Sequence, residues 1–79
     1  ELRQQNDMMA TIPCYSVFDA YHGGSGATVA AINAGLFVKA GADIEPEDID
    51  QFESLTGRVS LGDITLLQAE RIPATHGWI

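Results

Sequence analysis

Acidic side chains within residues 43–53 form the densest group of chemistry-bearing residues in the chain. Carboxylates at this spacing suit a calcium loop, a helix N-terminus or a contact with a basic partner surface. Counted from Asp43, the glycine position of an EF-hand loop holds Asp48 and its glutamate position holds Ser54, which excludes that calcium site. We interpret the group as a partner-binding surface at a helix start, made of Asp43, Glu45, Glu47, Asp48, Asp50 and Glu53.

A glycine-rich run precedes a segment of good helix formers at residues 23–26. At a helix start, the backbone N–H groups of Gly24, Ser25 and Gly26 offer an anion nest for a phosphate or a carboxylate. The lysine of a P-loop is absent, so a nucleoside triphosphate site is not predicted. The alternative is a flexible turn followed by a helix cap.

The other side chains able to bind a metal or act as a nucleophile are Cys14, His22 and His76. Their spacing matches no zinc site, and no base is assignable to the Cys14 thiol. The sequence therefore predicts no metal, no cofactor and no enzymatic activity. A lone cysteine also cannot form an intrachain disulfide, which favours a reducing, cytoplasmic location.

The elements that must position these residues are predicted mainly as helices. Helix formers over residues 1–12 predict a first helix, and Pro13 is placed to open a second that ends at Gly23. Residues 14–18 are also rich in β-forming side chains, so helix and strand remain open for 14–21.

Clear end signals bound the next helices. Ser25 is a candidate cap for a helix over about 27–39, with Gly41 as its stop. Proline and carboxylates in a first turn, followed by Gly57, predict a helix over 46–56. A last helix over about 61–71 is favoured by its helix formers, with a β-hairpin near 58–67 as the alternative.

These elements predict a mostly α fold: a single small domain over residues 1–79 with three to four helices. Trp78 and Ile79 are expected to fold back onto the body, because exposing both would leave an apolar end. Helical spacing predicts a core that contains Val29, Ile32, Leu36, Ile49, Phe52, Leu55, Leu61, Ile64 and Leu67.

Charge narrows the classes of function. The net charge is -7, from 11 acidic and 4 basic residues, which disfavours binding to nucleic acid and to anionic membranes. No apolar run approaches the roughly 20 residues that span a bilayer. We predict a non-catalytic protein-binding module for a basic partner: an adaptor, an inhibitor of the kind that phages and plasmids encode, or a small structural subunit. Self-association is also compatible with so short a chain.

The alternative function is a helix-turn-helix regulator that binds DNA as a dimer. Residues 50–70 have the outline of a helix, a turn at Gly57 and a second helix. The expected recognition helix offers Arg71 as its one cation and carries Asp63 and Glu70, which disfavours contact with phosphates.

Overall fold

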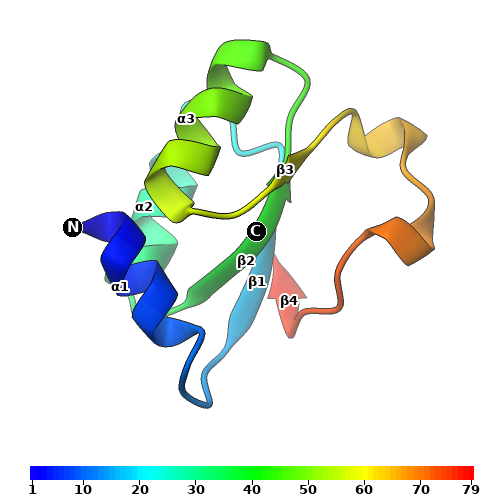
Figure 1. The fold of residues 1–79 in the computed structure, drawn as a ribbon. Coiled ribbons are helices and arrows are strands. Elements are labelled where there is room, and N and C mark those ends of the chain that lie inside the picture. The colour runs from blue at the N-terminus through cyan, green and yellow to red at the C-terminus, as the bar shows by residue number, and fades with distance from the viewer.

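The computed structural model describes residues 1–79 as helices that alternate with strands of one parallel sheet (Figure 1). The strands have the spatial order β3-β2-β1-β4, and every neighbouring pair is parallel. The predicted mostly α fold is therefore wrong, and the fold is α/β with a Rossmann-like βαβ arrangement. The elements are α1 (Leu2–Met9), β1 (Ser16–Ala20), α2 (Gly26–Asn33), β2 (Phe37–Ala42), α3 (Pro46–Thr56), β3 (Ser60–Leu61), the 3-10 turns η1 (Ile64–Leu66) and η2 (Ala69–Arg71), and β4 (Gly77–Trp78).

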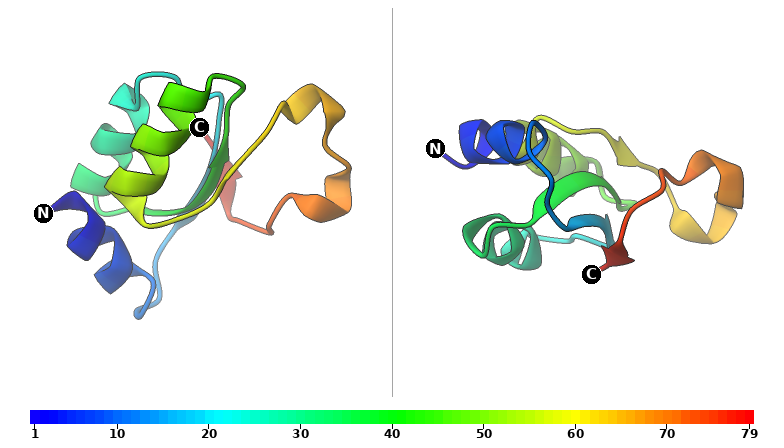
Figure 2. Two further views of the ribbon diagram at one scale, coloured as in Figure 1. Left: turned by 45° about the horizontal axis from the view of Figure 1, so that its top comes forward. Right: turned by 90° about the horizontal axis from the view of Figure 1, so that it is seen from below.

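The sheet is covered on both faces. The three α-helices lie on one face, and the segment that carries η1 and η2 lies over the other (Figure 2). Neighbouring residues of β1 separate the two cores: Val17 packs with the helices, while Phe18 packs beneath the η1–η2 segment. Strands buried on both faces are typical of parallel sheets. None of the α-helices has the length and apolar character needed to cross a membrane.

The strands correct two predicted helices. Residues 16–20 form β1, so the helix expected after Pro13 is wrong and the strand alternative is confirmed. The helix expected over 27–39 ends at Asn33, because Gly35 adopts a φ of 88° and the chain reverses into β2. Short apolar runs fit a buried strand as well as a buried helix, and here pairing in the sheet decides.

The segment after α3 contains neither the predicted helix over 61–71 nor the alternative hairpin. Ser60 and Leu61 pair in parallel with β2, and the turns η1 and η2 follow. The Asp63 side chain caps η1 by accepting from Thr65 N–H at 2.9 Å, but the helical turn ends at Leu66 and Leu67 is extended. The helix that the helix-turn-helix alternative required is absent.

Two of the predicted helices are present in the structure. The predicted helix over 46–56 is confirmed as α3, which ends at Gly57 with a φ of 69°. The predicted first helix is confirmed in its central part as α1. At the other end of the chain, Trp78 pairs with β1 and its ring lies 5.0 Å from the Phe18 ring, yet its side chain stays largely exposed.

The expected core is only partly correct. Ile32 and Phe52 are fully buried, while the other predicted members are half-buried. The centre is instead formed by strand residues that helical spacing does not identify: Val17, Phe18, Val38, Ala40 and Ala42.

Candidate functional site

The strand order creates one reversal point in the sheet. The chain passes from β1 to β2 and β3 in one direction, and β4 then pairs on the opposite side of β1. In parallel α/β sheets, ligands bind outside the carboxyl ends of the strands at such a reversal. The strands run toward the top of Figure 1, so the candidate site lies at that edge, where the loop of residues 21–26 follows β1.

This loop holds three residues in left-handed backbone conformations. Tyr21 has a φ of 56°, Gly23 a φ of 53° and Ser25 a φ of 70°. Such angles are uncommon for residues other than glycine, and they concentrate at binding and catalytic sites. Tyr21 is 53% exposed in the loop that follows β1, so the loop presents an aromatic residue to solvent.

The predicted anion nest lies at the start of α2. Ser25 occupies the position before the helix, but its hydroxyl makes no capping hydrogen bond. That oxygen is buried and has no partner at all, and an orphaned buried hydroxyl is unfavourable. The N-terminus of α2 thus has no side-chain cap, which leaves its first N–H groups for an anionic group of a ligand.

Asp43 comes directly after β2 and fastens the glycine loop. Its Oδ2 accepts from Gly23 N–H at 2.7 Å, and its Oδ1 accepts from Ile44 and Glu45 N–H at 2.8 and 3.0 Å. These backbone bonds, that from Glu45 first, hold the pKa of Asp43 below its ordinary value. The stability that this carboxylate contributes is present above its unfolded pKa and is lost as the pH falls through the lower folded value.

Asp19 is buried within β1, and Asp43 follows the neighbouring strand β2. Burial raises the pKa of its carboxyl, and a hydrogen bond from the Thr28 hydroxyl, followed by the nearby His22, offsets part of that effect. The raised value means that the folded chain holds this proton more tightly than the unfolded chain. Its favourable contribution is present below the unfolded pKa and disappears as the pH rises through the folded value.

We therefore expect Asp19→Asn to raise the free energy of unfolding at pH 7. Asparagine keeps an oxygen that accepts from Thr28 but carries no charge to bury. The advantage over the unmodified chain should grow as the pH rises through the titration of Asp19 and vanish in acid. Denaturant unfolding from pH 3 to pH 8 measures it, with the exposed Asp50→Asn as control. A variant less stable at pH 7 would contradict this expectation.

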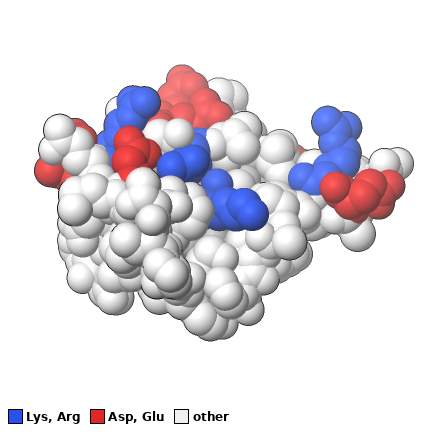
Figure 3. Space-filling model, turned by 60° about the horizontal axis from the view of Figure 1, so that its bottom comes forward, with Lys and Arg blue, Asp and Glu red and all other residues white.

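The carboxyl edge of the sheet carries negative charge without neighbouring cations. Asp19, Asp43 and Asp63 lie in or just after β1, β2 and β3, whereas no Lys or Arg occurs in residues 19–26, 43–45 or 61–63. Figure 3 brings the bottom of Figure 1 forward and shows Lys and Arg side chains on that other side, with Asp and Glu side chains beside them. Apart from the contact between His22 and Asp43, the only ion pair joins Arg58 to Asp7.

The structure divides the predicted acidic surface. Asp43 is buried, and Glu53 is half-buried with its Oε2 accepting from Ser60 N–H at 3.0 Å, so both have internal roles. Asp48 is half-buried as well. The members that the structure leaves exposed on or beside α3 are Glu45, Glu47 and Asp50.

The fold does not bring together the side chains of Cys14, His22 and His76. Cys14 donates to the Met9 carbonyl at 3.1 Å, and His76 Nδ1 accepts from Ser16 N–H at 2.9 Å near the start of β1. His22 instead lies in the loop at the carboxyl edge. No three side chains of the metal-binding types lie close enough to hold an ion.

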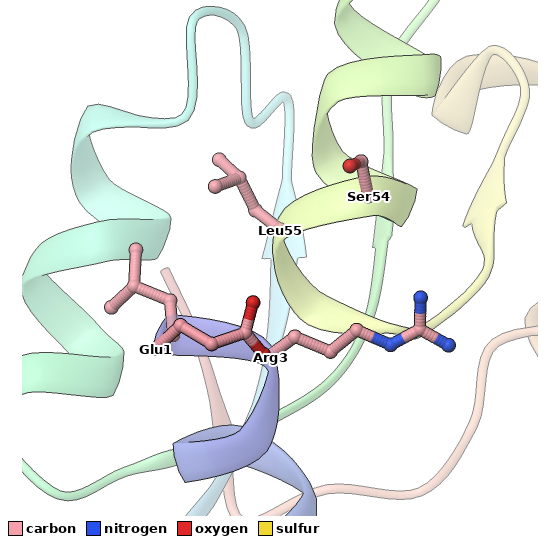
Figure 4. A pocket seen from close by; sticks show the side chains of 5 residues that line it. Glu1, Arg3, Ser54 and Leu55 are labelled. Carbon is pink, nitrogen blue, oxygen red and sulfur yellow. The ribbon is translucent and has the colours of Figure 1, made fainter.

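Two shallow hollows lie away from this edge. The hollow in Figure 4 lies between the start of the chain and the end of α3. It is lined by Glu1, Leu2, Arg3, Ser54 and Leu55. The second is lined mainly by polar residues around Lys39 and His76. Neither includes the glycine loop or Asp43, so the candidate site is an open edge.

Comparison with protein-family models, curated proteins and solved structures gives no match. The site is therefore defined by its geometry. Its residues that sequence reasoning did not select are Asp19, Tyr21, His22 and Asp63. The sequence contains a pattern that could have indicated this site. An apolar run ends in an acidic residue and is followed by a glycine-rich loop and a helix, and Asp43 comes 20 residues after Gly23.

Proposed function

We propose that this chain binds S-adenosylmethionine at the carboxyl edge of its sheet. The observation that carries the proposal is the position of Asp43. It directly follows β2, the strand paired with β1 on the side away from β4, and holds the glycine loop through Gly23, 20 residues earlier. In nucleotide-binding α/β folds an acid at this distance from the glycine loop binds the ribose hydroxyls.

Asp43 retains acceptor capacity for a ribose. Two carboxylate oxygens offer about four lone-pair positions, and three backbone N–H groups occupy three of them. The low pKa of Asp43 keeps it ionised at neutral pH, and hydrogen bonds to an ionised acceptor are the stronger kind. A ribose hydroxyl is the donor that suits the remaining position on Oδ2.

The adenine ring has an aromatic partner and a polar one. The exposed Tyr21 ring stands in the loop after β1 and offers a face for stacking. Asp63 follows β3 at the same edge, and its Oδ1 already accepts from Thr65, which fixes the carboxylate in place. Its other oxygen is suited to accept from the exocyclic amino group of adenine.

The amino-acid end of the cofactor carries a carboxylate. The uncapped start of α2, with exposed Gly24 and Gly26 on either side of Ser25, supplies backbone N–H groups and the positive end of a helix dipole for it. The predicted anion nest thereby receives a ligand group of suitable charge and size.

Charge favours this cofactor over a dinucleotide. A sulfonium and an ammonium group are attracted by Asp19 and Asp43, while a pyrophosphate finds no Lys or Arg at this edge. The dinucleotide fingerprint Gly-x-Gly-x-x-Gly is also incomplete. Gly24 and Gly26 match its first two glycines, but Val29 occupies the position of the third.

Isothermal titration of the 79-residue chain with S-adenosylmethionine, and separately with NAD, tests the proposal. We expect saturable binding of S-adenosylmethionine and none of NAD. Asp43→Asn should weaken that binding at least about tenfold, since a hydrogen bond to a charged group contributes about 1.5–3 kcal/mol.

The exposed Asp50→Asn on α3 removes the same charge and is the matched control, which should bind like the unmodified chain. Equal loss in both variants would indicate a general charge effect and refute the ribose role of Asp43. If the folded chain binds no S-adenosylmethionine at millimolar concentration, the proposal fails. The exposed carboxylates of α3 and a basic protein partner would then be the remaining prediction.

A further inference from the structure

The second hollow lies beside a bulge in the parallel pairing of β1 and β2. It is lined by Ser16, Lys39, Ala74, Thr75 and His76, and we call it the Lys39 hollow. Val17 pairs with Val38 and Phe18 pairs with Ala40, so Lys39 is an extra residue of β2 without a partner in β1. A β-bulge redirects a side chain, and bulges are over-represented next to functional sites.

The two cores confirm the effect of this bulge. Val38 packs with the helices and Ala40 packs beneath the η1–η2 segment, although residues two apart in a regular strand lie on the same face. The extra residue takes up this change of face. Its side chain belongs to neither core and is exposed at the hollow.

The Lys39 ammonium has no carboxylate partner. Its Nζ donates to the Ala74 carbonyl at 3.0 Å, which occupies one of its three N–H groups. Neither ion pair of the chain includes Lys39, and no Asp or Glu lines the hollow. The one lysine of a chain with a net charge of -7 therefore keeps an uncompensated positive charge and two donors at this place.

The imidazole of His76 is fixed at the same hollow. Its Nδ1 lies 2.9 Å from both the N–H and the hydroxyl of Ser16, and its ring stacks on the Tyr15 ring at 5.1 Å between centroids. A backbone N–H can only donate, so Nδ1 accepts and the ring proton lies on Nε2. Nε2 has no partner within the chain, and a protonated nitrogen cannot ligate a metal ion. It is a donor for a ligand.

The hydroxyl of Ser16 is a third donor. The single lone pair of His76 Nδ1 already accepts from Ser16 N–H, so the hydroxyl proton can rotate toward a ligand. The Thr75 hydroxyl, by contrast, donates to the Gly77 carbonyl at 2.9 Å. An ammonium, an imidazole N–H and a hydroxyl form a set of donors around one positive charge, which matches an oxyanion. The hollow, of about 360 Å³, has room for a phosphate group.

We propose that the Lys39 hollow binds a phosphate group through Lys39, His76 and Ser16. Lys39 supplies the charge, and the fixed imidazole and the hydroxyl orient the phosphate oxygens. The three residues come from β2, from the segment before β4 and from β1, so the bound group links three strands. This site lies near the start of β1, away from the carboxyl edge, and S-adenosylmethionine contains no phosphate. The inference is therefore independent of the proposed cofactor.

Nuclear magnetic resonance of the 79-residue chain tests the proposal, at pH 7 and constant ionic strength, as chloride is replaced by inorganic phosphate. We expect saturable shifts of the Ser16 N–H and the His76 ring signals, while the buried His22 ring does not shift. Lys39→Gln removes the charge of an exposed side chain and should raise the dissociation constant about tenfold. Arg71→Gln removes the same charge from an exposed position outside the hollow and should bind phosphate like the unmodified chain.

A further variant separates the binding role of His76 from its structural one. His76→Asn keeps an acceptor for the Ser16 N–H but lacks the Nε2–H, so it should fold and bind phosphate more weakly. O-phosphoserine identifies the source of the group. Tighter binding than that of inorganic phosphate indicates a phosphorylated side chain, and equal or weaker binding indicates free phosphate. Shifts that do not saturate, or equal losses in Lys39→Gln and Arg71→Gln, would overturn the proposal.

Discussion

Replacing Asn6 with alanine is expected to lower the free energy of unfolding by about 4 kcal/mol. Asn6 is fully buried, and its amide group joins three elements. Its Nδ2 donates to the carbonyls of Val38 and Thr56 at 3.0 and 3.1 Å, and its Oδ1 accepts from Val38 N–H at 2.9 Å. Alanine leaves these backbone groups buried without partners, at about 1–3 kcal/mol each.

This loss is large for so short a chain, whose total stability is expected to be roughly 4–12 kcal/mol. Urea unfolding followed by circular dichroism measures it. Asn33→Ala is the matched control, because Asn33 is exposed at the end of α2 and should change stability by less than about 0.5 kcal/mol. A loss below about 1 kcal/mol for Asn6→Ala would show that water or a shift of α1 satisfies the freed groups.

Gly41→Ala is expected to destabilise the chain by about 1–3 kcal/mol, the cost of overpacking a filled core. A Cβ atom at this position of β2 would lie 2.8 Å from the nearest Phe52 ring carbon and 2.9 Å from the Asp19 carbonyl oxygen. The ring is itself confined by His22, and the carbonyl belongs to the paired strand β1, so neither moves without disturbing the sheet.

The same change should weaken the proposed cofactor binding, because Gly41 is the register partner of Asp19 and lies two residues before Asp43. Gly62→Ala is the control, since a Cβ there meets no atom within 4 Å. Thermal unfolding of both variants gives the comparison. If Gly41→Ala matches Gly62→Ala in stability, then Phe52 relaxes and the close packing of α3 on β2 is not restrictive.

The sequence alone determined the elements whose signals are local. The start and end of α3 followed from Pro46, from the carboxylates of the first turn and from Gly57, whose left-handed conformation ends the helix. The break at the glycine loop was predicted for the same reason and is confirmed, since α2 begins at Gly26, while the anion nest stays a prediction. These signals act within a few residues, and at α3 they agree with the tertiary structure, which buries Phe52 against the sheet.

Only the tertiary structure decided the strands, and with them the site. β2 contains alanine, glycine and lysine, which favour strands weakly, and it becomes a strand because β1 and β3 supply hydrogen bonds on either side. β3 is two residues long and is specified by the same pairing. Parallel pairing joins segments far apart in sequence, and no local periodicity encodes it.

The predicted acidic surface shows the consequence for function. In sequence Asp43 was one carboxylate among six at a helix start, and its charge suggested a partner surface. In the fold it is buried beside Gly23, where three backbone N–H groups and a neighbouring imidazole define its role. Residue type fixed the chemistry that Asp43 can perform. The order of strands in the sheet decided which groups lie close enough to use it.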